Sequence, residues 1–231
     1  MTPIEEPYVV AIDGPSGSGK GSLALRIARH LGFHLLDSGA IYRLAALSAL
    51  RMGVDLEDEN AVTGLLSSLD IHFEEGDELT IPFLDGEDVS AQIRLENTGE
   101  AASVIAQFGS VRALLLERQR AFFQPPGLVA DGRDMGTVVF PGARFKFFLY
   151  ASPEVRAQRR HKQLISMGVS ANIAQLESEI RDRDERDRNR SESPLVPAAD
   201  ALVVDSSMLN LDQVTELVIS HIEEVNQTGP C

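Results

Sequence analysis

Gly14-Pro-Ser-Gly-Ser-Gly-Lys20 lies between an apolar run and a helical pattern, and this context decides the fold class. The run before it, residues 8–12, is apolar throughout, as is typical of a parallel strand buried on both faces. After it, apolar residues recur at helical spacing until Gly32. The segment matches G-x-x-x-x-G-K, in which glycines let backbone N–H groups approach phosphate oxygens at a helix N-terminus. The context predicts a loop that binds the phosphates of a nucleoside triphosphate.

Lys20 and the two residues after it define the chemistry expected at this loop. Lys20 is expected to reach the β- and γ-phosphates. Gly21 occupies the position where the pattern has a serine or threonine that binds Mg²⁺, and Ser22 comes one residue later. We therefore expect Ser22 to act through water, and no direct metal ligand is predicted. The residues expected to bind ATP here are Gly14, Pro15, Ser16, Gly17, Ser18, Gly19, Lys20, Gly21 and Ser22.

Strand-like and helical segments alternate along most of the chain. Further strands are predicted at residues 33–36, 128–131, 145–150 and 201–204, and further helices at 41–52, 153–165, 173–188 and 211–225. Strands separated by helices of this length imply right-handed βαβ crossovers and a parallel sheet covered on both sides. The expected fold class is therefore α/β, with a doubly wound five-stranded parallel sheet.

Residues 55–98 have a different pattern. Short alternating runs on either side of Asp85-Gly86 favour a small antiparallel hairpin unit, which we interpret as an insertion into the main sheet. Residues 101–123 are expected to form one long helix, ended by Pro125-Pro126-Gly127.

The composition narrows the range of partners. The 231 residues include 21 Lys and Arg against 35 Asp and Glu, a formal net charge of −14. This balance argues against nucleic acid or an anionic membrane, because both require a broad basic surface. The one cysteine, Cys231, excludes a disulfide framework, and the five histidines show no metal-ligand spacing. With neither a signal-peptide pattern nor an apolar stretch of membrane-spanning length, we expect a cytoplasmic protein.

Absent motifs separate the classes of nucleotide-binding protein. Neither N-K-x-D nor D-x-x-G occurs, which disfavours a GTPase. Asp131 follows a strand but precedes Gly132 rather than a glutamate that would activate water, which disfavours a motor ATPase. Phosphoryl transfer to a small acceptor remains.

Five segments carry a more specific resemblance. They are Gly14–Ser22, Leu36-Asp-Ser-Gly-Ala-Ile-Tyr-Arg43, Asp131-Gly-Arg-Asp-Met-Gly-Thr137, Arg186-Asp-Arg-Asn-Arg190 and Pro194-Leu-Val-Pro-Ala-Ala-Asp-Ala201. Through them nearly the whole chain after residue 7 resembles the bacterial cytidylate (CMP) kinases, which are P-loop nucleoside monophosphate (NMP) kinases. The resemblance implies transfer from ATP, with Mg²⁺, to CMP and dCMP in pyrimidine nucleotide metabolism, and we expect a monomer.

The resemblance also implies a division of the chain. A P-loop core is expected at residues 1–37 and 103–231, with a short lid near 156–170. An NMP-binding region is expected at 38–102, with its antiparallel insertion near 60–98.

Two strand ends are expected to open onto the ligand crevice. After the second strand, Ser38 is expected to cap the next helix, and Arg43 is either a surface residue or a two-pronged contact to the acceptor phosphate. After residues 128–131, Arg133 is expected to hold phosphate and Asp134 to accept from the amine of cytosine, the alternative being a surface Arg–Asp pair. By the resemblance, the residues that bind CMP also include Ser38, Arg43, Ser103 and Arg112.

The charged segment 181–190 allows two interpretations. Opposite charges recur at i,i+4 spacing, which is typical of a solvated helix whose pairs each contribute about 0.2–0.5 kcal/mol. However, Arg183, Asp187 and Arg190 fall on one helical face. By the resemblance, all three contact CMP, with Asp187 accepting from a sugar hydroxyl. Their order i, i+4, i+7 suits cations placed over a triphosphate.

Arg156, Arg159 and Arg160 form a second basic cluster, expected in the short lid, with Arg159 packed against adenine. The acceptor phosphate is ionised at neutral pH, so no general base is required. Catalysis is expected from positioning and charge stabilisation by Mg²⁺ and by Lys20, Arg133, Arg183 and Arg190. Two alternatives stay open: a kinase for UMP or another small acceptor, and a nucleotide-binding module without turnover.

Overall fold

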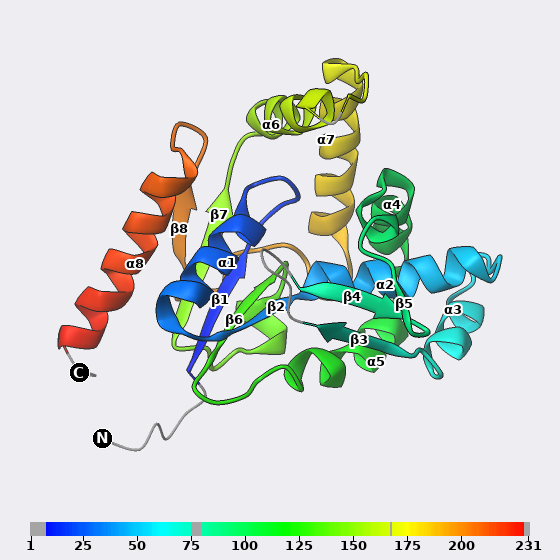
Figure 1. The fold of residues 1–231 in the computed structure, drawn as a ribbon, viewed down its shortest axis with the longest axis horizontal. Helices are drawn as coiled ribbons and strands as arrows, with labels where there is room; N and C mark the ends of the chain where they lie inside the picture. The colour runs from blue at the N-terminus through cyan, green and yellow to red at the C-terminus, as the bar shows by residue number, and fades with distance from the viewer. Residues whose placement is uncertain (1–7, 75–79, 167, 229–231) are drawn as a thin grey trace. The chain divides into compact units, whose positions relative to one another are not determined.

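The computed structural model describes residues 8–74, 80–166 and 168–228, and the chain divides into two compact units (Figure 1). The first unit comprises Met1–Leu36 and Phe123–Cys231, and the second comprises Asp37–Phe122. Residues 103–122, which the resemblance assigned to the core, belong to the second unit. Cys231 and the acidic start of the chain lie outside the described residues.

A five-stranded sheet, in the order β2-β6-β1-β7-β8, forms the centre of the first unit. Its strands are β1 (Val9–Asp13), β2 (His34–Asp37), β6 (Leu128–Gly132), β7 (Phe145–Tyr150) and β8 (Leu202–Asp205). β1 pairs in parallel with both β6 and β7, and β7 pairs in parallel with β8. Every residue of β1 and β6 is buried, which explains why both runs are almost entirely apolar. The predicted α/β class and five-stranded sheet are confirmed.

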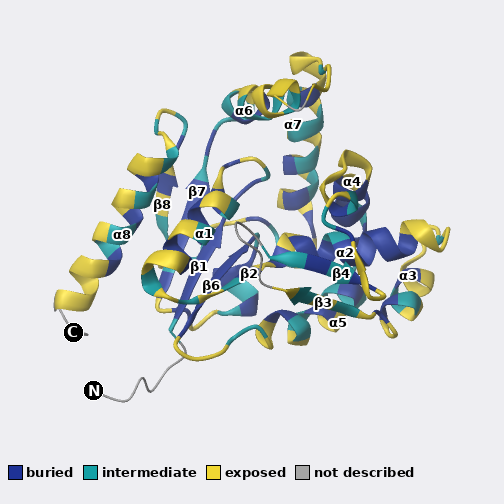
Figure 2. Ribbon diagram, in the orientation of Figure 1, coloured by how far each residue is buried: buried dark blue, intermediate teal, exposed yellow. Residues whose placement is uncertain are grey.

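The helices of the first unit are α1 (Lys20–Leu31), α6 (Pro153–Ser166), α7 (Ile173–Asn189) and α8 (Leu211–Thr228), with a short π-helical turn, η2 (Met135–Val139). Helices α1 and α8 pack against the sheet, whereas α6 and α7 pack on each other. Leu23 and Ile27 of α1 share a core with the sheet and with Val218 of α8, and Figure 2 shows these inner faces buried. As predicted, Ser152 caps α6, since its Oγ accepts from the backbone N–H of Val155 at 3.4 Å. Over residues 8–74, 80–166 and 168–228, no helix is long and apolar enough to cross a membrane.

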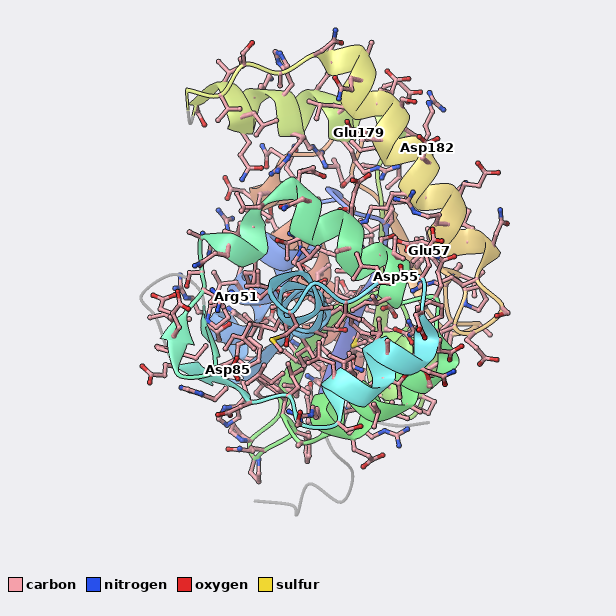
Figure 3. The ribbon with its side chains drawn as sticks, turned by 90° about the vertical axis from the view of Figure 1, so that its right-hand side faces the viewer. Arg51, Asp55, Glu57, Asp85, Glu179 and Asp182 are labelled. Atoms are coloured by element: carbon pink, nitrogen blue, oxygen red, sulfur yellow. The ribbon has the colours of Figure 1, made fainter. Side chains whose placement is uncertain are left out.

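The second unit combines helices with a small antiparallel sheet. Its elements are α2 (Ser38–Arg51), α3 (Glu59–Leu66), β3 (Ile71–Glu74), β4 (Ile81–Leu84), β5 (Glu87–Asp88), η1 (Gln92–Arg94), α4 (Glu96–Ile105) and α5 (Gly109–Arg120). β4 pairs antiparallel with β3 and with β5. Arg51, labelled in Figure 3 with Asp85 of the β4–β5 turn, donates to Glu87 at 2.9 Å and ties α2 to this sheet. The unit thus has the small α+β composition expected of the insertion.

The single long helix predicted at residues 101–123 is wrong. The structure has two helices, α4 and α5, because Phe108 is extended (φ −80°, ψ 124°) and Gly109 starts a new helix. Arg112 of α5 donates to the carbonyl oxygen of Ala106 at 3.2 Å, which satisfies a backbone acceptor at the break. Ile105 before the break and Leu115 after it are both buried. The apolar pattern therefore continues across a change of direction that it does not reveal.

Candidate active site

The phosphate loop, residues 14–19, connects β1 to α1 and runs close to the sheet. Gly17 and Gly19 have φ of 76° and 97°, values that side chains other than glycine rarely adopt. A Cβ on Gly14 would lie 2.1 Å from the carbonyl oxygen of Leu149 in β7, so this close approach also requires glycine. The loop ends at the N-terminus of α1, where free backbone N–H groups and the helix dipole favour phosphate.

Lys20, the first residue of α1, is buried and lies beside a carboxylate. Its Nζ donates to the carbonyl oxygen of Pro15 at 3.2 Å and lies 3.8 Å from Oδ1 of Asp131. Oδ2 of Asp131 lies 3.1 Å from the position that a Cβ on Gly21 would take. A serine or threonine at position 21 would therefore crowd this carboxylate, which is a physical reason for the departure from the usual pattern. Ser22 is exposed.

The residues beside Lys20 fit a Mg²⁺ ion that arrives with ATP. Such an ion is usually held by one or two carboxylates, the substrate phosphates and several waters. Asp131 supplies one buried carboxylate next to the phosphate loop. Within the described ranges, no group of three or more His, Cys, Asp or Glu side chains could hold a metal ion. Asp131 is thus a carboxylate that suits an ion bound largely by phosphate oxygens.

Asp13, the last residue of β1, is a buried acid that joins β1 to the segment after β6. Its Oδ1 accepts from the backbone N–H of Met135, and its Oδ2 from that of Gly136, both at 2.8 Å. Burial raises the pKa of Asp13 to about 6, although these two hydrogen bonds oppose the rise. The two N–H groups begin η2, immediately after the buried Asp134.

Asp187 of α7 forms the centre of a cluster of arginines. Arg133 donates from Nε to Oδ2 of Asp187 at 3.0 Å, and Nη2 of Arg190 lies 4.0 Å from Oδ1. Burial alone would raise the pKa of Asp187, but the charges of Arg133, Arg190 and Arg183 outweigh it and hold the pKa below its usual value. Burial alone would lower the pKa of Arg133, yet Asp187 reverses this and the pKa is raised. Three predicted phosphate-binding arginines thus surround one ionised carboxylate.

Arg156 is fully buried and connects three parts of the first unit. It forms a bidentate pair with Asp184 of α7, with Nη1 at 2.9 Å from Oδ1 and Nη2 on Oδ2. It also donates to the carbonyl oxygens of Ala151 at 2.9 Å and of Ser16 in the phosphate loop at 3.0 Å. The sequence grouped Arg156 with the lid arginines, but the structure places its guanidinium in the interior, where four acceptors satisfy it. By contrast, Asp182 on the same helix, labelled in Figure 3, is exposed.

Arg159 lies on the same helix and contacts the loop after β8. It donates to the carbonyl oxygens of Ser206 at 2.6 Å and of Ser18 at 3.2 Å. Burial lowers the pKa of Arg159. The guanidinium is therefore fixed between the phosphate loop and the loop that follows β8, and its packing against adenine stays a prediction.

In the second unit, Ser38 has a different local role from the one predicted. Asp37, not Ser38, caps α2, because its Oδ1 accepts from the backbone N–H of Ala40 at 3.0 Å. Ser38 is the buried first residue of the helix, and its Oγ donates to Oε1 of Gln119 in α5 at 2.8 Å. The capping prediction is wrong because the preceding aspartate has the extended conformation that an N-cap requires.

The other predicted residues of the second unit lie on three helices that pack together, α2, α4 and α5. Arg43 of α2 donates to the carbonyl oxygen of Ile93 at 2.6 Å. Arg112 of α5 has its guanidinium carbon 5.6 Å from the ring centroid of Tyr42. Ser103 of α4 is buried, and its hydroxyl has no hydrogen-bond partner among the described residues. Such a hydroxyl is costly unless another group satisfies it.

Comparison with known proteins decides the family. The family model described as cytidylate kinase matches residues 10–224. A cytidylate kinase of Aeromonas salmonicida (strain A449) is 56% identical over 216 residues, which cover 94% of this chain and 94% of that protein. Another, of Burkholderia vietnamiensis (strain G4 / LMG 22486), is 53% identical over 225 residues, 97% of each. The chain belongs to the cytidylate kinase family. A solved gluconokinase from Sinorhizobium meliloti 1021 covers 94% of this chain and 93% of its own at 17% identity and a TM-score of 0.48, too low to bear on the reaction.

In this member of the cytidylate kinase family, the site residues predicted from the sequence are divided between the two units. The first unit brings Arg133, Arg183, Asp187 and Arg190 together, and it also holds the phosphate loop and Asp134. The second unit holds Ser38, Arg43, Ser103 and Arg112. The roles of these residues toward nucleotides stay predictions.

Sequence reasoning missed the structural roles of three charged residues in the first unit, Asp13, Asp184 and Arg156, although it did assign Arg156 to the lid. Asp13 ends an otherwise apolar strand, and a carboxylate at that position was a usable signal. Arg156 and Asp184 are 28 residues apart and show no pattern that would pair them. Their partnership depends on how α6 packs on α7.

Proposed function

We propose that this chain transfers the γ-phosphoryl group of ATP to CMP, and to dCMP, giving ADP and the cytidine diphosphate. The observation that carries this proposal is the cluster of Arg133, Arg183 and Arg190 around Asp187, in the same unit as the phosphate loop. Two phosphate groups that must approach each other repel, and arginines held together by one carboxylate can offset this repulsion. The 53–56% identity to cytidylate kinases supports CMP as the acceptor.

The residues of the first unit supply charge and position. Lys20 and the backbone N–H groups of the phosphate loop bind the donor phosphates, and the arginines neutralise charge as the phosphoryl group moves. Asp131 would hold a Mg²⁺ ion whose charge shields the phosphate oxygens when ATP is bound. The acceptor phosphate is already ionised, so no side chain has to remove a proton. Catalysis by this chain is therefore positioning and electrostatic stabilisation.

The acceptor is recognised by side chains that accept hydrogen bonds and by side chains that donate them. Asp134, as a carboxylate, can only accept, which suits the exocyclic amine of cytosine and not the carbonyl of uracil. The buried hydroxyl of Ser103, without a partner among the described residues, suits a second contact to the base. Arg43 and Arg112 supply guanidinium groups for the acceptor, and Asp187 suits a sugar hydroxyl.

The test is ADP formation measured with CMP, dCMP, UMP, AMP and shikimate in parallel, with Mg²⁺ present and then removed by a chelator. We expect CMP to be the best acceptor and activity to be lost without the metal. A preference for UMP or for shikimate would favour the other small-acceptor kinases. ATP binding without ADP formation from any acceptor would favour a nucleotide-binding module.

We also propose that the protein acts as a monomer in the cytoplasm, where ATP and CMP occur. Its net charge of −14 supports small-molecule substrates rather than nucleic acid. Sedimentation of the purified chain with and without CMP tests the oligomeric state.

A further inference from the structure

Asp13 holds a turn that lies 122 residues away in the chain. The first N–H groups of a helical turn have no partner within it. Those of Met135 and Gly136 in η2 are satisfied by the carboxylate of Asp13, one by each oxygen. The carbonyl oxygen of Asp134 in turn accepts from the N–H groups of Val138 and Val139 at 2.9 and 3.1 Å. The peptide unit that follows the Asp134 side chain is thus held at both ends, at its carbonyl oxygen and at its N–H group.

The packing around this link leaves little room for adjustment. A Cβ on Gly136 would lie 3.2 Å from Cδ of Lys146 and 3.4 Å from Oδ2 of Asp13. Asp13 and Asp134 are both buried, and the negative charge of Asp134 acts against that of Asp13, while the charge of Lys20 favours it. A carboxylate kept in surroundings that disfavour its charge is a candidate for a functional role.

We propose that Asp13 is a positioning residue for base recognition: by holding the N–H groups of Met135 and Gly136, it fixes the Asp134 carboxylate and thereby sets the preference for cytosine over uracil. This inference rests on the proposed function, in which Asp134 accepts from the cytosine amine. If Asp13 acts through Asp134, its loss affects CMP more than UMP and leaves ATP binding almost unchanged.

The first test is Asp13→Asn, which keeps the shape of the side chain but turns an NH₂ group toward one of the two N–H donors. We expect kcat/KM for CMP to fall by about tenfold or more, as for the loss of a hydrogen bond to a charged group. The KM for ATP should change by less than about twofold. The ratio of kcat/KM for CMP to that for UMP should fall. Asp58→Asn is the matched control, because the exposed Asp58 also accepts from a backbone N–H, that of Ala61, at 3.0 Å.

A second variant guards against the first one failing to fold. Gly136→Ala disturbs the same link from the other side and leaves Asp13 in place, so it should narrow the CMP to UMP ratio in the same direction. In an Asp134→Ala background, Asp13→Asn should cause no further narrowing, because the side chain that it positions is gone. Additive effects of Asp13→Asn and Asp134→Ala on this ratio would overturn the proposal.

The failure of this inference is distinguishable from failure of the proposed function. If the wild-type chain does not phosphorylate CMP, the proposed function itself is wrong. If it prefers CMP and Asp13→Asn keeps that preference, only the positioning role is wrong. An equal loss of affinity for ATP and for CMP would assign Asp13 to the phosphate loop instead.

Discussion

Helices α6 and α7 are joined by two Arg–carboxylate pairs, one buried and one exposed. In the pair of Arg156 with Asp184, the side chains are 0% and 3% exposed. In the pair of Arg181 with Glu154, they are 51% and 49% exposed. Water and salt screen the exposed pair, whereas removing one partner of the buried pair leaves an uncompensated charge in the interior. The same residue types on the same two helices therefore have different consequences, and burial decides which.

The largest expected effect is that of breaking the buried pair. Asp184→Asn leaves the Arg156 guanidinium without its counter-charge, so we expect a loss of about 3–5 kcal/mol in the free energy of unfolding. Urea unfolding followed by circular dichroism measures this. The double variant Arg156→Met with Asp184→Leu should lose less than the single variant, because no buried charge is left. A loss of less than about 1 kcal/mol for Asp184→Asn would mean that the pair behaves like an exposed one.

Lys20→Met removes a buried charge that lies at the phosphate loop and not between two helices. We expect phosphoryl transfer to fall by about 100-fold to 1000-fold, equivalent to about 2.7–4 kcal/mol of transition-state stabilisation. The melting temperature should fall as well, because the buried Asp131 carboxylate loses the charge 3.8 Å away, so activity is compared below the unfolding transition. Single-turnover ADP formation measures the effect. A variant that keeps more than about a tenth of wild-type turnover would contradict the assignment of the phosphate loop.

Asp187→Ala tests the second buried acid of α7. Removal of the carboxylate frees Arg133, Arg183 and Arg190 from their common partner, and we expect about 1.5–3 kcal/mol of lost CMP efficiency. The ratio of kcat/KM for CMP to that for dCMP should also narrow if Asp187 accepts from a sugar hydroxyl. Asp182→Ala, on an exposed site of the same helix (Figure 3), is the control. An unchanged ratio of kcat/KM for CMP to that for dCMP in Asp187→Ala would contradict the contact between Asp187 and the sugar.

The pH dependence of stability tests burial at Asp13. Because burial raises the pKa of Asp13 from 3.8 to about 6, the folded protein binds this proton more tightly than the unfolded chain does. The contribution to stability is fully present below about pH 3.8 and is lost as the pH rises through about 6. From pH 5 to 7, the wild type should lose about 1 kcal/mol more than Asp13→Asn. Urea unfolding at both values measures this, and equal losses would contradict the raised pKa.

The smallest effect is expected at the exposed pair. Glu154→Gln removes the charge that faces Arg181, but Arg181 keeps a bond to Glu177 at 2.8 Å and both side chains remain in water. The unfolding midpoint should stay within experimental error at physiological salt. A loss comparable to that of Asp184→Asn would show that exposure does not separate the two pairs.

Local signals were sufficient for the phosphate loop, the five strands and most helices. The strand, glycine loop and lysine are contiguous, and a doubly buried strand is visible as an apolar run. The common face of Arg183, Asp187 and Arg190 also follows from helical spacing, and the two arginines do act on the Asp187 carboxylate. Ser38 shows the limit of such signals, because the N-cap depended on the conformation of its neighbour Asp37.

What the tertiary structure decided concerns partners far apart in the chain and the burial of charge. The i,i+4 pattern of α7 pairs Asp184 with Arg188, and these do lie 3.8 Å apart, yet the closer partner is Arg156, 28 residues away. The break between α4 and α5 and the hydrogen bonds that Asp13 accepts from η2 also depend on tertiary packing. Periodicity reports which face of a segment is apolar, because that depends on local geometry alone. Which charges lose water, and which groups then satisfy them, is settled only when distant segments pack together.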